Sequence, residues 1–576
     1  MRVIVTIVIH KLNLMDEKEK YSLRKAIYRF YHLVNVERRE IMNVYFYAVI
    51  SGFILLSLPL GIQAITNLLF GGTVSTSLIV LIGVVILGVI LNGVLQVGQM
   101  RITERIQQRI FTRLTFAYAY RIPRISLLSI DEYYLPELVN RFFDTANLQK
   151  GFSKLLLDFP AASIQILFGL TLLCFYHPVF IIFALMIITL VLLIFYLTSP
   201  RGFNTSMAES DYKYDVAHWL EEVSRAIKTF KFGQEHELHL DRTDKLVTGY
   251  LESRDAHFSV LLFQYRVMIA FKVVVIGAIL IIGSFLFIKQ QINLGQFIAA
   301  EIIIITVLNS IEKMILSLEV LYDVLTSLEK LNKVLDKPQD DEHTLTLNHQ
   351  MAITTGMDIK INGLTFSYPD HKPAINGIDI HILSGEKICL MGPEGSGKST
   401  LLRLLAGIYN DFSGNILYND MPLKMIPGNI LHRRVSILLA DEELFSGTLF
   451  ENITVGNKAV GLEELDAVCK IVGLIDYIHG QQKGYQVFLD PQGKKLSYNI
   501  IQKILLARCL ILKPALLLME DGWMGIEASV REQVISYLTA ASSEFTMIAV
   551  TSDETFSSRC DRRIYMEKGS MKPNTI

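Results

Sequence analysis

The sequence is poor in charged residues, and this shortage narrows the class of protein. Charged residues make up 19% of the 576 residues, whereas hydrophobic residues make up 51%. A chain of this length is too long for one ordinary domain, and this composition is too apolar for a protein that is soluble throughout. The net charge of -1 provides no general attraction for nucleic acid, so we expect no nucleic-acid partner.

Cysteine is also scarce. The five cysteines are odd in number, widely spaced and free of any CxxC or Cys/His cluster. This pattern predicts buried, reduced thiols rather than a disulfide framework or a metal site. The N-terminus carries no convincing signal peptide, because its apolar residues 3–9 are followed by charge and not by a cleavage site; Met15 is an alternative start to Met1.

The apolar residues gather in six long runs before about residue 316. Each run is long enough, or nearly so, to cross a hydrocarbon core about 30 Å thick as a helix. Soluble helices rarely run this long without charge, so we predict six membrane spans. The predicted spans are 45–65, 78–97, 155–176, 178–197, 268–288 and 294–315.

The links between the spans alternate in length and in charge. Links within the pairs 1/2, 3/4 and 5/6 are short, and Lys289 is their only lysine or arginine. The long links 2/3 and 4/5 and the N-terminal segment carry many arginines and lysines. The positive-inside rule therefore places both termini and both long links in the cytoplasm.

The long link after span 2 continues with a helical period. Arg101, Arg105, Arg109 and Arg113 recur every four residues, which predicts one basic face on a helix that runs out of the span. One interpretation is a stripe that faces an inner cavity for an anionic cargo. The alternative is a solvated face, or side chains that reach back to anionic lipid headgroups.

Two of the charged residues inside the predicted spans are candidates for a special role. Glu301 lies about two turns into span 6, where a lone carboxylate costs roughly 2.5–3.5 kcal/mol, so it should face a partner or a water-filled cavity. Contact with substrate and a structural hydrogen bond inside the helix bundle are both open interpretations. Lys272 in span 5 lies toward the cytoplasmic side, where its side chain can snorkel to the interface.

The last part of the chain has the composition of a soluble α/β domain. A helical pattern ends near residue 335, the polar segment 336–356 reads as a linker, and a new domain occupies 357–576. An apolar strand at 387–391 leads into a glycine-rich loop and then a helix, the context of a phosphate-binding loop. The residues of this candidate phosphate-binding loop are Gly392, Pro393, Glu394, Gly395, Ser396, Gly397, Lys398, Ser399 and Thr400.

This motif predicts ATP and Mg²⁺ as cofactors. Backbone N–H groups of the loop would surround the phosphates, Lys398 would reach the β- and γ-phosphates, and the Ser399 hydroxyl would bind Mg²⁺. With its six spans, the chain resembles the ATP-binding cassette (ABC) half-transporters of the exporter type. The resemblance implies a six-helix transmembrane domain of the type-1 exporter kind at 43–335, after a cytoplasmic segment 1–42. It implies an α/β P-loop ATPase domain at 357–576.

Further motifs carry the resemblance through the second domain. Phe-Ser-Tyr-Pro at 366–369 resembles the family's aromatic loop, which implies that Tyr368 stacks on adenine. Leu496 and Ser497 stand where the signature motif opens a helix, so Ser497 is a candidate ATP contact. The apolar strand that ends in Glu520 and Asp521 resembles the strand that carries the Mg²⁺-binding and catalytic carboxylates.

The chain departs from the family at the positions that cleave ATP. The family's glutamine falls on Ala440 and its switch histidine on Ser552. Its LSGGQ signature reads Leu-Ser-Tyr-Asn-Ile at 496–500. Its Asp-Glu pair is inverted to Glu520 and Asp521, and an aspartate of the next loop is replaced by Glu527. No histidine follows residue 490, so aligning the sequence to the family's motif one or more residues differently would not supply a switch histidine.

These departures predict ATP binding with slow cleavage. Asp521 is one methylene too short to place the attacking water, and a misplacement of about 1 Å can cost about a hundredfold in rate. Tyr498 and Asn499 replace glycines whose backbone must approach the γ-phosphate closely. Glu520 keeps an oxygen ligand for Mg²⁺.

The resemblance also implies a dimer, in which each ATP lies between one chain's phosphate loop and the other chain's signature. A homodimer of this chain would have two damaged sites. A heterodimer with an intact partner would keep all hydrolytic residues at one site. We expect two chains per transporter in a bacterial-type inner membrane, with segments near 143–149 and 223–228 as contacts with the nucleotide domain.

The cargo is the least determined part of the interpretation. The membrane half most resembles the branch that secretes peptides and toxins, which implies a periplasmic adaptor as a further partner. Export of a lipid or small molecule is an alternative within the same class. An ATP-binding membrane scaffold or regulator that does not transport is the alternative from another class, and an importer fused to its ATPase is a third.

Overall fold

The computed structural model describes residues 22–70, 76–129, 135–233, 237–340, 356–369, 371–520 and 526–572. The chain divides into two compact units. The first, here the membrane unit, comprises Met1–Pro123 and Tyr133–Lys337. The second, here the nucleotide unit, comprises Arg124–Glu132 and Pro338–Ile576.

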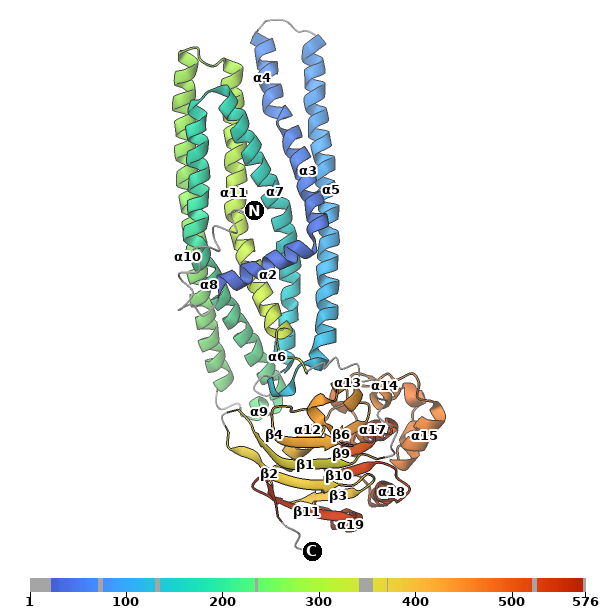
Figure 1. Cartoon of the computed structure of the whole chain (residues 1–576). Coiled ribbons are helices and arrows are strands. Elements are labelled where there is room, and N and C mark those ends of the chain that lie inside the picture. Colours follow the sequence, from blue (N-terminus) through green and yellow to red (C-terminus); the bar gives the residue numbers. More distant parts are fainter. Residues whose placement is uncertain are drawn as a thin grey trace. The chain divides into compact units, whose positions relative to one another are not determined.

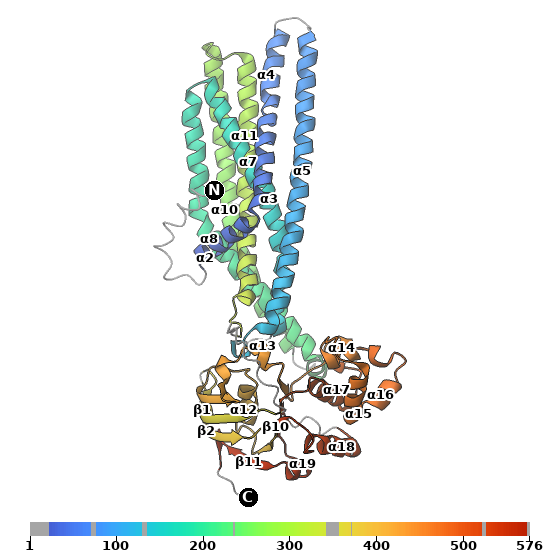
Figure 2. The ribbon, with the colours of Figure 1, turned by 45° about the vertical axis from the view of Figure 1, so that its right-hand side comes forward.

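The membrane unit is all-helical, and six helices or helix pairs are long and apolar enough to cross a membrane, which confirms the six predicted spans. In both views α3 and α4 run alongside α5 (Figures 1 and 2). The helices of this unit are α2 (Leu23–Val36), α3 (Arg38–Leu55), α4 (Ser57–Phe70), α5 (Thr76–Arg121), α6 (Leu135–Asn140), α7 (Asp144–Tyr176), α8 (Val179–Arg225), α9 (Ile227–Phe232), α10 (Leu238–Ile288) and α11 (Leu294–Leu335).

The first span is interrupted, which the sequence analysis did not predict. α3 ends at Leu55 and α4 begins at Ser57, four and two residues before Pro59. Pro59 has no N–H group to offer the carbonyl of Leu55, four residues earlier, so the helical ladder breaks there.

The helices continue far beyond the apolar runs. α5 extends to Arg121, whereas its predicted span ends at residue 97. At about 1.5 Å per residue the extension is roughly 36 Å long. The predicted continuation of the helical period into the long link is therefore confirmed, and α11 ends at Leu335, where the sequence pattern placed its end.

The span α11 forms the centre of the membrane unit. Half of its most apolar window is buried, against 6% for α5. It packs against α7 so closely that a Cβ at Gly169 would lie 2.7 Å from the Val307 side chain. The large apolar surface left on α5 is what a helix in contact with lipid or with another chain presents.

The nucleotide unit contains two main sheets. The first is antiparallel, in the order β2-β1-β4-β5, and the second has the order β12-β11-β3-β10-β9-β6 with a parallel core. Their strands are β1 (Ile359–Ser367), β2 (Pro373–Ile382), β3 (Lys387–Met391), β4 (Ser413–Tyr418), β5 (Met421–Pro422), β6 (Val435–Leu438), β9 (Leu516–Met519), β10 (Thr546–Val550), β11 (Arg562–Glu567) and β12 (Ser570–Met571). A short third pair joins β7 (Gly447–Thr448) to β8 (Phe488–Leu489).

The parallel sheet is covered on both faces. Along β9, Leu516 and Leu518 enter the core shared with the antiparallel sheet, whereas Leu517 and Met519 enter the core formed with helices. This alternation explains why the strand reads as a continuous apolar run. The helices are α12 (Lys398–Leu405), α13 (Gly428–Leu431), α14 (Leu449–Thr454), α15 (Leu462–Ile471), α16 (Ile475–His479), α17 (Tyr498–Ile511), α18 (Ala528–Leu538) and α19 (Glu554–Arg559).

The predicted fold class is thus confirmed: an all-α membrane unit with six spans and an α/β nucleotide unit. In Figures 1 and 2, α14, α15 and α17 of the nucleotide unit gather on one side, away from β1 and β2. This arrangement separates α17, the helix that begins in the signature segment, from the antiparallel sheet.

A segment of the long link after α5 belongs to the nucleotide unit. Ile125 bridges to Gln339, the Ser126 N–H donates to the Pro338 carbonyl at 2.9 Å, and Leu128 packs against the core shared by the two sheets. Residues 125–128 are not among the segments, 143–149 and 223–228, for which the resemblance implied contacts with the nucleotide domain. Both named segments fall in the membrane unit, and their role stays a prediction.

Candidate nucleotide site

The predicted strand, loop and helix around the phosphate loop are present as β3, residues 392–397 and α12. Gly392 and Gly397 have φ of +140° and +97°, a region that side chains disfavour. A Cβ at Gly392 would lie 2.1 Å from the Met566 carbonyl oxygen, and one at Gly397 would lie 2.5 Å from the Ala374 carbonyl oxygen. The loop conformation therefore requires glycine at both positions.

Lys398 is folded onto its own loop. Its ammonium donates to the carbonyls of Gly392 at 2.8 Å and Pro393 at 2.7 Å, and to the hydroxyl of Ser396 at 3.1 Å. Burial lowers the pKa of Lys398, while the carboxylates of Glu394 and Glu520 act in the opposite direction. The ammonium is thus held inside the loop by neutral acceptors, which a charged phosphate group can replace.

Glu520 follows β9 and is fixed by the neighbouring strand. Its N–H donates to the Leu438 carbonyl at 2.8 Å, and its Oε2 accepts the Ala440 N–H at 3.0 Å. Its other carboxylate oxygen, Oε1, is buried and has no hydrogen-bond partner in the part of the chain that the structure describes. An orphaned carboxylate oxygen near the phosphate loop fits a Mg²⁺ ligand or the partner of a Mg²⁺-bound water.

Two further candidates bear on the cleavage chemistry. Ser399 is half-buried at the start of α12, next to Lys398. Asp521, the predicted catalytic carboxylate, lies outside the described residues. Among the described residues no group of three or more His, Cys, Asp and Glu side chains could hold a metal ion.

Tyr368 lies beside the phosphate-loop helix. Its ring packs edge-to-face on Phe366 and Tyr409, with centroid distances of 5.1 and 5.7 Å. Its hydroxyl forms a hydrogen bond of 3.2 Å with the hydroxyl of Thr400. The structure therefore brings Tyr368 to the loop, and its stacking on adenine stays a prediction.

The signature segment begins α17. Ser497 caps this helix by accepting the Ile500 N–H at 3.4 Å, and the Tyr498 side chain is 57% exposed. A side chain thus projects where a glycine would leave bare backbone for a phosphate.

Glu527 has a role that the sequence analysis missed. Its carboxylate accepts the Asn499 amide at 2.6 Å and the Lys503 ammonium at 2.7 Å. The bond from Lys503 is the main cause that lowers the pKa of Glu527. Glu527 follows the loop after β9, so it ties that loop to the signature helix. Glu527 lies 24 and 28 residues from its two partners in the sequence, so no helical or strand periodicity could have predicted these contacts.

The remaining departures lie at strand ends. Ala440 is exposed two residues after β6, and Ser552 is exposed two residues after β10. Since β6, β9 and β10 are parallel neighbours, their carboxyl ends place Ala440, Glu520 and Ser552 along one edge of the sheet.

The two charged residues singled out in the predicted spans, Lys272 and Glu301, have different surroundings. Lys272 on α10 pairs with Glu312 on α11 at 3.1 Å. Glu301 is half-buried, and the described residues give it neither a hydrogen bond nor an ion pair, so the expected structural hydrogen bond is not observed. A contact between Glu301 and substrate remains a hypothesis.

Comparison with known proteins identifies the class to which this arrangement belongs. The family model described as the ABC transporter transmembrane region matches residues 41–311, and the model described as ABC transporter matches residues 375–522. The two models together cover well over half of the sequence, so the chain belongs to the ABC transporters. Its six-span unit and its ATPase domain are those of an exporter-type ABC transporter.

Curated relatives are distant. The chain is 28% identical to the ABC multidrug transporter MDR2 of Trichophyton rubrum over 42% of its length and 18% of that protein. It is 26% identical to the lactococcin-G-processing and transport ATP-binding protein LagD of Lactococcus lactis over 48% of its length and 39% of LagD. It is 28% identical to the alpha-hemolysin translocation ATP-binding protein HlyB of Escherichia coli over 42% of its length and 34% of HlyB. The chain therefore aligns with less than two fifths of each of these relatives.

A solved structure shares the whole fold. The bacterial Atm1-family ABC exporter with ATP bound superposes with a TM-score of 0.82, covering 93% of this chain and 96% of that one. The sequence identity is 16%, so the likeness shows the fold alone.

Proposed function

We propose that this chain is one subunit of an ATP-dependent exporter that moves a peptide, protein or amphipathic cargo across the inner membrane. The observation that carries this proposal is an intact phosphate loop, with its glycines and Lys398 in place, in a chain with six membrane spans. LagD and HlyB, two relatives named for transport and translocation, support the choice of cargo class. Export of a lipid or small molecule is the alternative within this function.

ATP would bind with Mg²⁺. Ser399 and Glu520 would hold the ion, and the buried, orphaned Oε1 of Glu520 supports this role. Tyr368 and the loop residues 392–400 would hold the nucleotide, and Ser497 would contact it from the other chain. The bound ion would neutralise the charge of the phosphates.

Hydrolysis would be weak in this chain. Asp521 is shorter than the glutamate that the family uses, and Ser552 is too short to sense the γ-phosphate as an imidazole does. Ala440 has only a methyl group in place of the glutamine that couples the γ-phosphate side to the membrane domain. The exposed Tyr498 adds bulk where the signature of the second chain would meet ATP. ATP would then act mainly to hold the closed state, as a ligand that favours one of two conformations.

The assembly would contain two chains, as a homodimer or with a different half-transporter. Both termini, the linker 336–356 and the nucleotide domain 357–576 would lie in the cytoplasm, which the arginine-rich long links support. The bilayer surrounds the membrane domain 43–335, and a periplasmic adaptor would join if the cargo is a secreted peptide.

A non-transporting ATP-binding scaffold or regulator is the second candidate. The altered residues Ala440, Tyr498 and Ser552 favour it, because a sensor needs binding and not cleavage. The two functions differ in whether ATP changes access to the interior of the membrane unit.

Cysteine labelling distinguishes the two functions. Asn309 is exposed on α11, on the same face as Glu301. In a background with Cys174→Ser and Cys560→Ser, which removes both half-buried thiols, Asn309→Cys would be labelled by an impermeant maleimide in inside-out vesicles. An exporter predicts that ATP changes the labelling rate severalfold. The same rate with and without ATP would reject alternating access and favour the scaffold. Lys398→Ala in the same background controls for nucleotide binding.

A further inference from the structure

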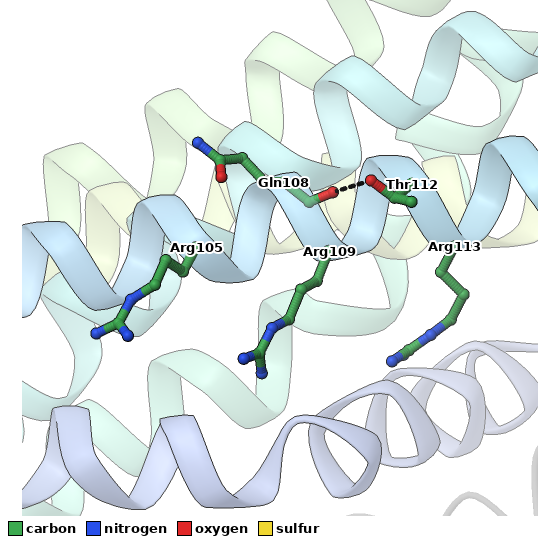
Figure 3. A pocket seen from close by; sticks show the side chains of 5 residues that line it. All are labelled: Arg105, Gln108, Arg109, Thr112 and Arg113. Atoms are coloured by element: carbon green, nitrogen blue, oxygen red, sulfur yellow. Dashed lines mark hydrogen bonds between the residues drawn. The ribbon is translucent and has the colours of Figure 1, made fainter.

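A basic groove lies on the extension of α5 beyond its apolar run. It has a volume of about 390 Å³ and is lined by Arg105, Gln108, Arg109, Thr112 and Arg113. Figure 3 shows the three arginines projecting in parallel from one face of α5. The nucleotide site does not use this groove, because the groove belongs to the membrane unit alone.

Acidic residues of α3 and its start hold two of the arginines in place. Glu37, which is 3% exposed, pairs with Arg113 at 3.0 Å and with Arg109 at 3.6 Å, and Glu40 pairs with Arg109 at 3.3 Å. Arg109 and Arg113 remain about half exposed, at 51% and 48%. A guanidinium carries five N–H donors, so each arginine is fixed and still has donors for a further ligand.

Among the three arginines of the groove, Arg105 is the one without a contact that fixes its side chain in the described structure. The described residues give it neither an ion pair nor a hydrogen bond, and its side chain is exposed at one end of the groove. Segments 37–40 and 101–113 together hold six arginines and three glutamates, a formal surplus of three positive charges. The groove therefore has an uncompensated charge that favours an anion.

The kind of cation points to phosphate. Between Lys25 and Lys150 the chain has ten arginines and no lysine. Arginine presents a planar fork that binds the oxygens of phosphate or carboxylate in pairs, whereas lysine acts as a point charge. The hydroxyl of Thr112, which bonds to the Gln108 carbonyl at 2.8 Å, lines the same groove (Figure 3).

The position of the groove along α5 indicates that it lies at the level of the membrane surface. α3 and α5 pack together where Gln99 donates to the Val44 carbonyl at 3.5 Å, and both helices change from apolar to basic near this level. Arg105 lies eight residues past the apolar run, about 12 Å along the axis. Side chains of a helix tilt toward its N-terminus, so on α5 they lean back toward the bilayer. The headgroup layer extends about 5–8 Å beyond the hydrocarbon core, within reach of Arg105.

Exposed aromatic side chains mark the same surface. Tyr28 and Tyr31 on α2, the helix that precedes α3, are 68% and 41% exposed. Tyrosine is enriched where a protein meets lipid headgroups. We propose that the groove binds the phosphate group of an anionic phospholipid, with Arg105 as the main contact and Arg109 completing the site.

The test measures lipid binding to the full-length protein in detergent by native mass spectrometry. The probes are phosphatidylglycerol, phosphatidylcholine and inorganic phosphate. The variants are Arg105→Gln, which removes the charge, and Arg105→Lys, which keeps the charge and removes the fork. Arg266→Gln is the matched control, since Arg266 is an exposed arginine of α10 just before its apolar run.

The proposal predicts that the wild type and Arg266→Gln retain phosphatidylglycerol over phosphatidylcholine. Arg105→Gln should bind phosphatidylglycerol about fivefold more weakly, and Arg105→Lys should fall in between. Retention of phosphatidylglycerol by Arg105→Gln at the wild-type level would overturn the proposal. Equal binding of the two lipids by the wild type would also overturn it. So would Arg105-dependent binding of inorganic phosphate without lipid retention, which would indicate a soluble anion.

Discussion

At the scale of single residues, the backbone of the phosphate loop sets the strictest requirement. Gly397 has φ of +97°, and any Cβ there would meet the Ala374 carbonyl oxygen. The loop cannot relax away from this contact without moving the N–H groups that would bind phosphate. Binding of ATP is thus more sensitive to this position than to most side chains around it.

We predict that Gly397→Ala lowers ATP affinity at least tenfold, because the strained backbone costs of the order of 1–3 kcal/mol before the contact is counted. Binding of a fluorescent ATP analogue to the purified protein measures the effect. Gly461→Ala is the matched control, since Gly461 has φ of -76° and open space around it. Wild-type affinity of Gly397→Ala would show that the loop binds in another conformation.

Glu527 provides a second prediction, for stability and its pH dependence. Its carboxylate joins Asn499 and Lys503, and its pKa lies below the usual value because of the bond from Lys503. A depressed pKa in the folded state adds stability above the unfolded pKa, near 4.5, and this stability is lost as pH falls through the folded pKa. The side chain is 56% exposed, so solvent screening limits the effect to about 1 kcal/mol or less.

Glu527→Gln should therefore lower the thermal midpoint by a few degrees at pH 7. The difference from the wild type should shrink as pH falls below about 4.5 and disappear below the depressed pKa of the folded state, because protonated Glu527 resembles glutamine. Glu544→Gln, at an exposed position without an ion pair among the described residues, should have no effect. A difference that grows at acid pH would contradict the assigned ion pair.

At the scale of elements, two thiols meet beside the phosphate loop. The Sγ atoms of Cys389 on β3 and Cys560, which follows α19, lie 2.8 Å apart. The prediction of buried thiols thus holds for Cys389, Cys469 and Cys509, while Cys560 and Cys174 are half-buried. β3 leads directly into Gly392, so a covalent bond between these thiols would restrain the strand that carries the loop.

We predict that glutathione disulfide oxidises this pair to a disulfide, with the electrons passing to two glutathione molecules. Intact-mass analysis and thiol titration would show the loss of two thiols per chain. The variant Cys389→Ser should prevent the reaction, whereas Cys509→Ser should not. Persistence of both thiols under conditions that oxidise an unfolded sample would contradict the close approach.

The elements also show how far the sequence could predict the structure. The six spans, the helical extension of α5 and the strand before Gly392 follow from local patterns, because apolar period and glycine spacing are local properties. The pairs Glu37–Arg113, Lys272–Glu312 and Asn499–Glu527 join residues far apart in the chain. No local pattern marks such pairs, since many charged residues compete as partners. The segment at 125–128 was missed for the same reason.

At the scale of the whole molecule, binding and cleavage of ATP depend on different parts of the site. The phosphate loop, Lys398 and Tyr368 form a compact group around α12, and the structure supports binding there. We propose that cleavage depends on the ends of β6, β9 and β10, where the resemblance implies that Ala440 and Ser552 replace functional side chains of the family. We therefore propose a transporter subunit in which ATP binding is retained and turnover is reduced.

The most direct test of this account measures nucleotide binding and ATP turnover by the purified chain in lipid nanodiscs, with Lys398→Ala as the control for contaminating ATPases. The account predicts tight binding that Lys398→Ala abolishes, and turnover that does not exceed the control. Turnover that depends on Lys398 and reaches about 1 s⁻¹ or more, within the usual range for enzymes, would contradict it. Glu520 and Asp521 would then form a working variant of the catalytic pair.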